Sequence, residues 1–144
     1  MIEYTVRVYP DNTTWFLNGK LHREDGPAIE MADGSKRWYL NGNRHREDGP
    51  AIEWADGDKE WYLNNQLHRE DGPAIEYADG SKFWYLNGQR HREDGPAIEW
   101  ADGNDKEWYF NDQRHREEEF AKPATELTIA EIEKLLGYAI KVVK

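Results

Sequence analysis

A nine-residue string, HREDGPAIE, occurs four times without a single change in this chain of 144 residues. The copies are 23 residues apart and begin at His22, His45, His68 and His91. A fifth, degenerate copy reads HREEEF and begins at His115, displaced by a one-residue insertion. Periods of this length are typical of stacked supersecondary units, none of which can bury its own apolar face alone. The chain is therefore predicted to be a tandem-repeat protein.

Each unit has the pattern of a β-hairpin. In the second unit the residue types alternate with period two over residues 28–31 and 36–40, which indicates two strands. Asp33-Gly34 lies between them and is typical of a two-residue hairpin turn. Such a turn would place Ile29 opposite Trp38, and a β-branched residue opposite an aromatic ring is a favourable cross-strand pair.

The fifth unit supports this register, because its insertion falls in the turn. Residues 102–104 lengthen the turn by one and would keep Ile98 opposite Trp108. Five such hairpins make an all-β fold, one elongated antiparallel sheet of about ten strands and roughly 45 Å. The repeat domain is predicted to cover residues 1–120. The pattern leaves open whether the segments between hairpins contain a further short strand.

Residues 121–144 depart from the repeat and predict a C-terminal cap of one helix and one strand. Thr128 and Glu131 fit a capping box at the helix start, and Gly137 is a natural stop. Residues 138–143 alternate as a final strand. Such a cap would cover the open end of the stack, as terminal repeats usually require.

The alternation also assigns the two faces of the sheet. We expect the core on the face that carries Ile29, Trp38 and Leu40 with their equivalents. The residues just before the turns would lie on that face too, namely Met31, Trp54, Tyr77 and Trp100. The opposite face would expose a row of glutamates, a row of tyrosines and a variable position. The variable position is occupied by Arg37, Glu60, Phe83 and Glu107.

The unit WYLNGxxHREDGPAIExADGSK resembles the MORN repeat, which is built around an aromatic residue, Asn-Gly, a following His, then Gly and a later Asp-Gly. The family's His-Gly-x-Gly appears here as His-Arg-Glu-Asp-Gly-Pro, which indicates a divergent subclass. The resemblance covers residues 1 to about 120 and implies an elongated, twisted sheet of hairpins. It also implies roles in scaffolding, protein interaction and, in some members, membrane-lipid contact. The ending TELTIAEIEKLLGYAIKVVK resembles the tails of small phage-type proteins.

Charge and composition narrow the function. The formal net charge of −10 disfavours direct binding to nucleic-acid phosphates or anionic lipid, and suits a basic protein partner. The chain has no Cys, which excludes a disulfide framework and a thiolate zinc site. The start, MIEYTVRVYP, lacks the pattern of a signal peptide, and no apolar run reaches the length of a membrane span. We therefore expect a cytoplasmic protein.

The repeated histidines invite a metal-binding interpretation, which their spacing disfavours. Copies of one position would lie about 10 Å apart, too far to share an ion. The Arg-Glu-Asp triplet could supply an acid and a charge partner, but a catalytic site is usually singular and this triplet is repeated. We expect no enzyme activity, no cofactor and no bound metal, with the histidines bracing the loops.

The exposed face is the best candidate for binding, with an ordinary solvated sheet surface as the alternative. Phe83 on an otherwise polar sheet is typical of interface residues, and the variable position would provide specificity. The predicted partner-binding residues are Tyr62, Phe83, Tyr85, Tyr109, Glu53, Glu60, Glu99 and Glu107.

These features favour a non-catalytic protein-interaction module. The leading hypothesis is a phage accessory factor that binds and inhibits a host toxin or defence enzyme. One alternative is an acidic nucleic-acid mimic, although the charge is unevenly distributed among the repeats. The other is a small-ligand binder, or sponge, that uses pockets between repeats.

Overall fold

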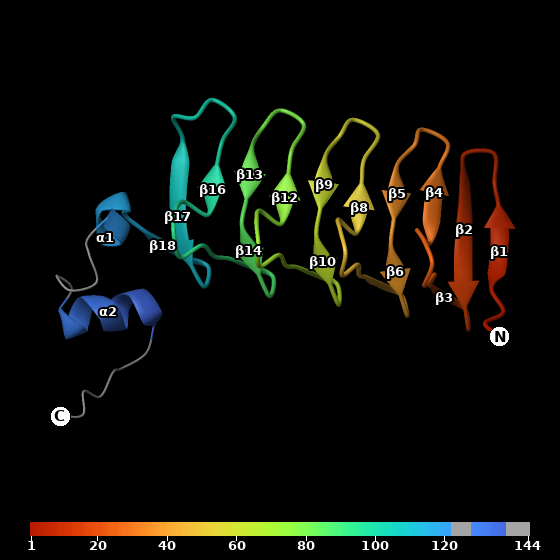
Figure 1. Ribbon diagram of the computed structural model, residues 1–144, viewed down its shortest axis with the longest axis horizontal. Helices are drawn as coiled ribbons and strands as arrows, with labels where there is room; N and C mark the ends of the chain where they lie inside the picture. Colours follow the sequence, from red (N-terminus) through yellow and green to blue (C-terminus); the bar gives the residue numbers. More distant parts are fainter. Residues whose placement is uncertain (122–127, 138–144) are drawn as a thin grey trace.

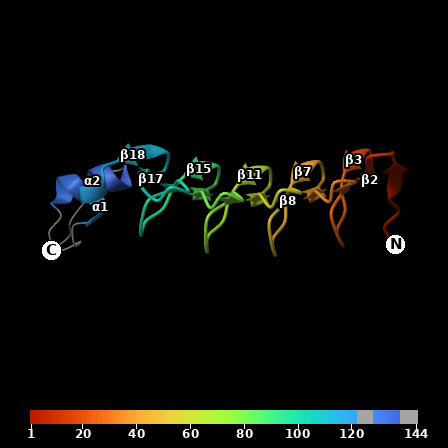
Figure 2. The ribbon, with the colours of Figure 1, turned by 90° about the horizontal axis from the view of Figure 1, so that it is seen from above.

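The computed structural model describes residues 1–121 and 128–137 and contains a long antiparallel sheet of successive hairpins. Figure 1 shows the hairpins side by side in sequence order, with the helices beyond the last of them. Seen from above, the strands follow one line and connecting loops project to one side (Figure 2). The predicted all-β fold of tandem hairpins with a short C-terminal helix is confirmed.

The strands of the long sheet come in pairs joined by tight turns. The first hairpin consists of β1 (Thr5–Val8) and β2 (Asn12–Leu17). The first strands of the next four units are β4 (Ile29–Met31), β8 (Ile52–Glu53), β12 (Ile75–Glu76) and β16 (Ile98–Glu99). Their second strands are β5 (Lys36–Arg37), β9 (Lys59–Glu60), β13 (Lys82–Phe83) and β17 (Lys106–Phe110). Each of β5, β9 and β13 also pairs with the first strand of the next unit, which makes the sheet continuous.

A second, smaller hairpin follows in each unit, which answers the question that the sequence leaves open. The three complete ones are β6 (Tyr39–Leu40) with β7 (Asn43–Arg44), β10 (Tyr62–Leu63) with β11 (Gln66–Leu67), and β14 (Tyr85–Leu86) with β15 (Gln89–Arg90). At the two ends, β3 (Lys20–Leu21) pairs with β2 and β18 (Gln113–His115) pairs with β17. Asn41 and Gly42 form one of the turns with φ of 51° and 81°. Two positive φ angles in a two-residue loop are the signature of the type I′ turn that Asn-Gly favours.

The register of the main hairpins differs by one position from the sequence-based expectation. Ile29 lies opposite Arg37 and not opposite the neighbouring tryptophan. The turn contains three residues, because the Met31 N–H donates to the Ser35 carbonyl (2.9 Å) and Gly34 takes a φ of 96°. Three-residue hairpin loops of this kind end in a left-handed residue, usually glycine. The predicted pairing of isoleucine with tryptophan is therefore wrong.

The insertion in the fifth unit does lie in the turn, as predicted. It leaves Ile98 opposite Glu107, the position equivalent to Arg37 opposite Ile29. In all four of these units the isoleucine thus pairs with the variable position. The prediction that the pairing is the same in each unit is confirmed, but the predicted partner, tryptophan, is wrong.

The shift by one position reassigns the two faces. Direct partners share a face, and so do residues two apart in a strand. The isoleucines therefore share a face with the variable position and with Tyr39, Tyr62, Tyr85 and Tyr109, and we call it the tyrosine face. Trp38, Leu40 and their equivalents lie on the opposite side, the loop face, which the HREDGP loops cover. The expected core face with isoleucine and tryptophan together is wrong.

The HREDGP loops fold onto the tryptophans. The Arg46 guanidinium lies 3.9 Å from the centre of the Trp38 ring, a cation–π contact. It also donates to Asp48 (2.9 Å), to the Pro50 carbonyl (3.1 Å) and to Glu53 (3.0 Å). Arg23, Arg69 and Arg92 repeat this arrangement on Trp15, Trp61 and Trp84. The arginine, the aspartate, the proline carbonyl and the final glutamate of the repeated string thus take part in one bonded arrangement in each unit.

Burial is confined to small clusters along the sheet, because one layer cannot build a deep core. Ala51, Ile52 and Tyr62 form one cluster, against which Trp38 and Leu67 pack. The same positions two units later form another, with Ala97, Ile98 and Tyr109. Four alanines, one from each HREDGPAIE copy, are completely buried, namely Ala28, Ala51, Ala74 and Ala97. The backbone carbonyl of each alanine accepts a hydrogen bond from the backbone N–H of the tryptophan in the preceding unit.

The C-terminal end carries α1 (Glu117–Ala121) and α2 (Ile129–Leu136). The predicted capping box is present, since Thr128 and Glu131 bond to each other's backbone N–H groups. Gly137 ends α2 with a φ of 72°, as predicted. The predicted strand at 138–143 lies outside the described residues. Neither helix in the described part of the chain is long and apolar enough to cross a membrane.

Candidate interaction surface

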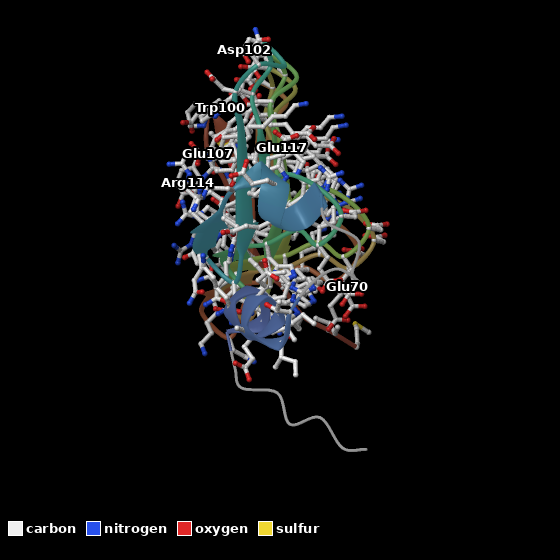
Figure 3. All side chains as sticks on the ribbon, turned by 90° about the vertical axis from the view of Figure 1, so that its left-hand side faces the viewer. Glu70, Trp100, Asp102, Glu107, Arg114 and Glu117 are labelled. Atoms are coloured by element: carbon white, nitrogen blue, oxygen red, sulfur yellow. The ribbon has the colours of Figure 1, made fainter. Side chains whose placement is uncertain are left out.

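A row of large side chains crosses the tyrosine face beside the main turns. It includes the residues that precede the turns, of which Trp54, Tyr77 and Trp100 are exposed, Trp100 by 43%. In Figure 3, which looks along the sheet from its C-terminal end, Trp100, Glu107 and Arg114 project on one side and Glu70 of a loop on the other. The sequence analysis placed these aromatic residues in the core, which is wrong. A signal was present, because this position varies while remaining mostly aromatic.

Three aromatic side chains in this row form one connected group, which we call the aromatic triad: Tyr77, Phe83 and Trp100. Phe83 lies between the other two, with ring centres 5.3 Å from Tyr77 and 5.0 Å from Trp100. The interplanar angles of 78° and 81° are edge-to-face, the geometry that the aromatic quadrupole favours. Phe83 is consequently half-buried rather than isolated on a polar surface, while its two neighbours stay exposed.

The stretch of the row that precedes the aromatic triad contains charged residues. It consists of Arg37, Trp54 and Glu60, which we call the polar triad. The Arg37 guanidinium lies 4.7 Å from the centre of the Trp54 ring, and the Trp54 indole N–H donates to the Glu60 carboxylate at 2.9 Å. The second oxygen of Glu60 accepts from the Tyr62 hydroxyl at 2.8 Å. Trp54 is therefore held between a guanidinium on its ring and a carboxylate on its N–H.

The tyrosine row beneath is more buried than the sequence analysis expected. Tyr62 is only 7% exposed and Tyr109 is equally buried, while Tyr85 is half-buried. Arg44 stacks on Tyr62 at 4.1 Å from the ring centre, and Arg90 stacks on Tyr109 at 4.0 Å. The expectation that Tyr62 and Tyr109 stand exposed is wrong, because arginines of the small hairpins cover their rings.

The phenol pKa values follow from this burial. Desolvation raises the pKa of Tyr62 well above its ordinary range, and the hydrogen bond to Glu60 raises it further. Desolvation also raises the pKa of Tyr109, again reinforced by a carboxylate, Glu107. Both hydroxyls stay protonated at neutral pH and act as donors within the face.

The predicted glutamates separate into two groups. Glu60 and Glu107 lie on the tyrosine face, close to Phe83 in the same row. Glu53 and Glu99 lie on the loop face, where they accept from Arg46 and Arg92 at 3.0 Å. The structure thus brings together six of the eight predicted binding residues and separates these two. The physical cause is the cross-strand register, because a one-residue shift exchanges the faces of paired residues.

The loop face contains a repeated cleft between successive loops. One cleft, of about 760 Å³, is bounded by Arg46, Asp48, His68 and Asp71 and floored by Trp61. Equivalent clefts lie one unit before it and one unit after it.

The loop histidines connect neighbouring units. His45 accepts through Nδ1 from the Asn64 backbone N–H at 3.1 Å, and His22 accepts likewise from Asn41 at 2.9 Å. This is the bracing contact that the sequence predicts. In residues 1–121 and 128–137, no group of three or more His, Asp or Glu side chains is placed to hold a metal ion.

A comparison with models of protein families gives no match to this chain, and neither does a comparison with curated proteins.

Proposed function

We propose that this chain is a non-catalytic protein-interaction module that engages its partner through the aromatic triad. The observation that carries the proposal is the exposure of Tyr77 and Trp100 on either side of Phe83. Aromatic residues are enriched at the centres of protein interfaces, and Trp and Tyr are the commonest residues with large binding energies. Their mutual packing holds the rings in place before binding, which lowers the entropic cost of association.

The repeat architecture supports one specific site rather than a uniform surface. The HREDGP loops are identical, so they present the same chemistry in each unit. The row on the tyrosine face changes from unit to unit, and only its later part is continuously aromatic. Glu60 and Glu107 flank the aromatic triad and would favour a partner with basic groups at the rim, where charges mainly speed the encounter.

We further propose that the partner is a cytoplasmic host toxin or defence enzyme and that the chain inhibits it. The support is the sequence alone: the resemblance to MORN repeats, and the phage-type character of the C-terminal tail. An extended sheet of hairpins suits a role in which binding itself blocks another protein.

The test begins with an affinity pull-down and mass spectrometry to identify the partner. Its affinity is then measured by calorimetry for the double variant Phe83→Ser with Trp100→Ser. Loss of such anchors is expected to cost roughly 2 kcal/mol or more, about a thirtyfold loss of affinity. Trp54→Ser is the matched control. Trp54 belongs to the polar triad and, like Trp100, directly precedes a main turn, so its loss should leave the affinity unchanged. Wild-type affinity in a folded double variant would contradict the proposal.

The clefts of the loop face support a second candidate, a small-ligand binder that uses pockets between repeats. Each cleft is concave and combines one tryptophan and one leucine with charged loop side chains, which would suit a small polar ligand. A native mass spectrum of the protein from producing cells distinguishes this function, since a bound ligand would add a fixed mass per occupied cleft. The nucleic-acid mimic has less support, because every loop aspartate is paired with an arginine. A mimic's binding would also collapse with salt.

A further inference from the structure

The two ends of the sheet differ. At the C-terminal end, α1 and α2 lie beyond the last hairpin (Figure 1). At the N-terminal end, β1 is an edge strand: in the described part of the chain it pairs with β2 alone. Open edges are templates for another strand, and proteins usually protect them with lysine, proline or a covering segment. The sequence of β1, TVRV, contains no lysine or proline, and Arg7 is its one charged residue.

The exposed side chains of this end are unusually apolar. Val6 and Val8 are exposed on one face of β1, Val8 by 77%, and Ile2 just before the strand is exposed as well. The alternation places Thr5 and Arg7 on the other face. An exposed edge with an apolar stripe on one face favours strand addition over an isolated sheet end.

The hydrogen bonds within the first hairpin determine which backbone groups point outward. The Tyr9 N–H donates to the Asn12 carbonyl at 2.7 Å, so Tyr9 belongs to a hydrogen-bonded pair. In antiparallel sheets such pairs alternate with pairs that lack these bonds. Thr5 and Arg7 therefore bond toward β2, while Val6 and Val8 direct their N–H and C=O groups away from the sheet.

We propose that β1 pairs with β1 of a second copy of this chain, antiparallel and across a two-fold axis at Thr5. In the dimer, β1 would extend back to Ile2, which precedes the strand in this structure. This register places Tyr4 opposite Val6 of the second copy, so the outward backbone groups meet in hydrogen-bonded pairs. Glu3 then faces Arg7 of the second copy, and the symmetry makes this ion pair twice. The exposed apolar side chains Ile2 and Val8 face each other across the same axis.

Neighbouring registers lack this complementarity. Centring the axis on Arg7 would place two guanidinium groups opposite each other, and like charges directly opposite are destabilising. Centring it on Val6 would leave Glu3 and Arg7 without opposite charges. A shift by one residue would set outward backbone groups against inward ones. The Arg7 guanidinium lies 4.8 Å from the Phe16 ring centre on an exposed strand, where it can reach a carboxylate across the axis.

The dimer would be a reversible one, because a single strand pair buries little area. The dimer would use residues remote from the aromatic triad, so its test is independent of the test of the proposed function. The experiment is sedimentation equilibrium of the 144-residue chain over a wide concentration range. The expected result is a shift from the monomer mass of 17.0 kDa toward twice that mass. A monomer at all concentrations would overturn the proposal.

Charge exchange tests the register. Glu3→Arg and Arg7→Glu each set like charges opposite one another and should weaken self-association about tenfold. A mixture of these two single variants should form heterodimers, and the double exchange should restore self-association. Val6→Pro removes an outward donor without breaking a bond to β2, so it should abolish dimers while leaving the melting temperature unchanged. Wild-type dimerisation of either single charge variant or of Val6→Pro would also overturn the proposal.

Discussion

The polar triad and the aromatic triad occupy successive stretches of one row on the same sheet. Their backbones match: Ile52 lies opposite Glu60, and Ile75 lies opposite Phe83, with turns of the same length. Yet Trp54 contacts a carboxylate and a guanidinium, whereas Tyr77 and Trp100 pack edge-on against the ring at the variable position. One scaffold thus presents charged groups around a tryptophan in one stretch and a group of aromatic rings in the next.

The difference shows that the residues that build the fold and the residues that determine the surface of the tyrosine face occupy different positions of the repeat. The invariant residues make the turns, the loop braces and the buried alanines, and they are used equally in every unit. On the tyrosine face, the variable position is half-buried and the residue before the turn is exposed in three units, so their side chains can be exchanged without disturbing the turns or the loops. Surface identity can therefore change along the sheet without a change of fold.

The largest effect is expected where the backbone beneath both triads is disturbed. Gly57 and Gly80 take φ of 102° and 98° in equivalent turns, so a β-branched residue is strained at either position. Gly57→Val and Gly80→Val should each lower the free energy of unfolding by about 1–3 kcal/mol. Chemical denaturation measures both. Gln66→Val, at an exposed strand position, is the control. If the two substitutions lowered the free energy of unfolding by different amounts, the turns beside the two triads would not be structurally equivalent.

A smaller effect is expected when the aromatic triad is made polar. Phe83→Glu gives this unit the residue that Glu60 provides in the polar triad, and it removes two edge-to-face contacts. The expected loss is about 1 kcal/mol of unfolding free energy, with a weaker near-ultraviolet circular dichroism signal from the aromatic rings. Phe83→Leu, which keeps apolar contact, should cost about half as much. If Phe83→Glu leaves both signals unchanged, the three rings do not act as a group.

The smallest effect at neutral pH concerns the tyrosines below the two triads. Burial raises the pKa of both Tyr62 and Tyr85, but only Tyr62 has a carboxylate acceptor, Glu60, because Phe83 takes that place beside Tyr85. Glu60→Gln should lower the pKa of Tyr62 toward that of Tyr85. Tyrosine-labelled NMR titration measures both values, and an unchanged Tyr62 would argue against the hydrogen bond.

The sign of the pH dependence follows from the direction of this shift. A phenol whose pKa is raised in the folded state holds its proton more tightly there than in the unfolded chain. Its contribution to stability is complete below about pH 10, the unfolded value, and is lost as the pH rises through the folded pKa. The wild type should therefore lose stability above pH 10 more steeply than the Glu60→Gln variant.

Several features could be predicted from particular residues. Asp-Gly at a fixed period located every main turn after the first hairpin, and Thr128 with Glu131 and Gly137 located the ends of α2. The extra residue in the fifth turn was also placed correctly. These are local signals, in which the backbone angles depend on residues adjacent in sequence.

The candidate site was predicted less well. Phe83 and its carboxylate neighbours were found, but Trp54, Tyr77 and Trp100 were assigned to the wrong face. The cause was a turn that uses Ala32 as well as Asp33 and Gly34, which moved the register by one. A register shift of one residue exchanges the faces of every partner across the turn, so a small local error became a global one.

The sequence by itself determined the repeat, the hairpins and the positions at which units differ, because turn chemistry and alternation act over a few residues. Only the tertiary structure decided which of those positions reach solvent. Burial of Tyr62 depends on Arg44, which reaches it from the preceding unit, and the place of Trp38 depends on a loop that folds back over it. Both contacts join residues that no short-range pattern connects, and their energy is gained only when the units stack.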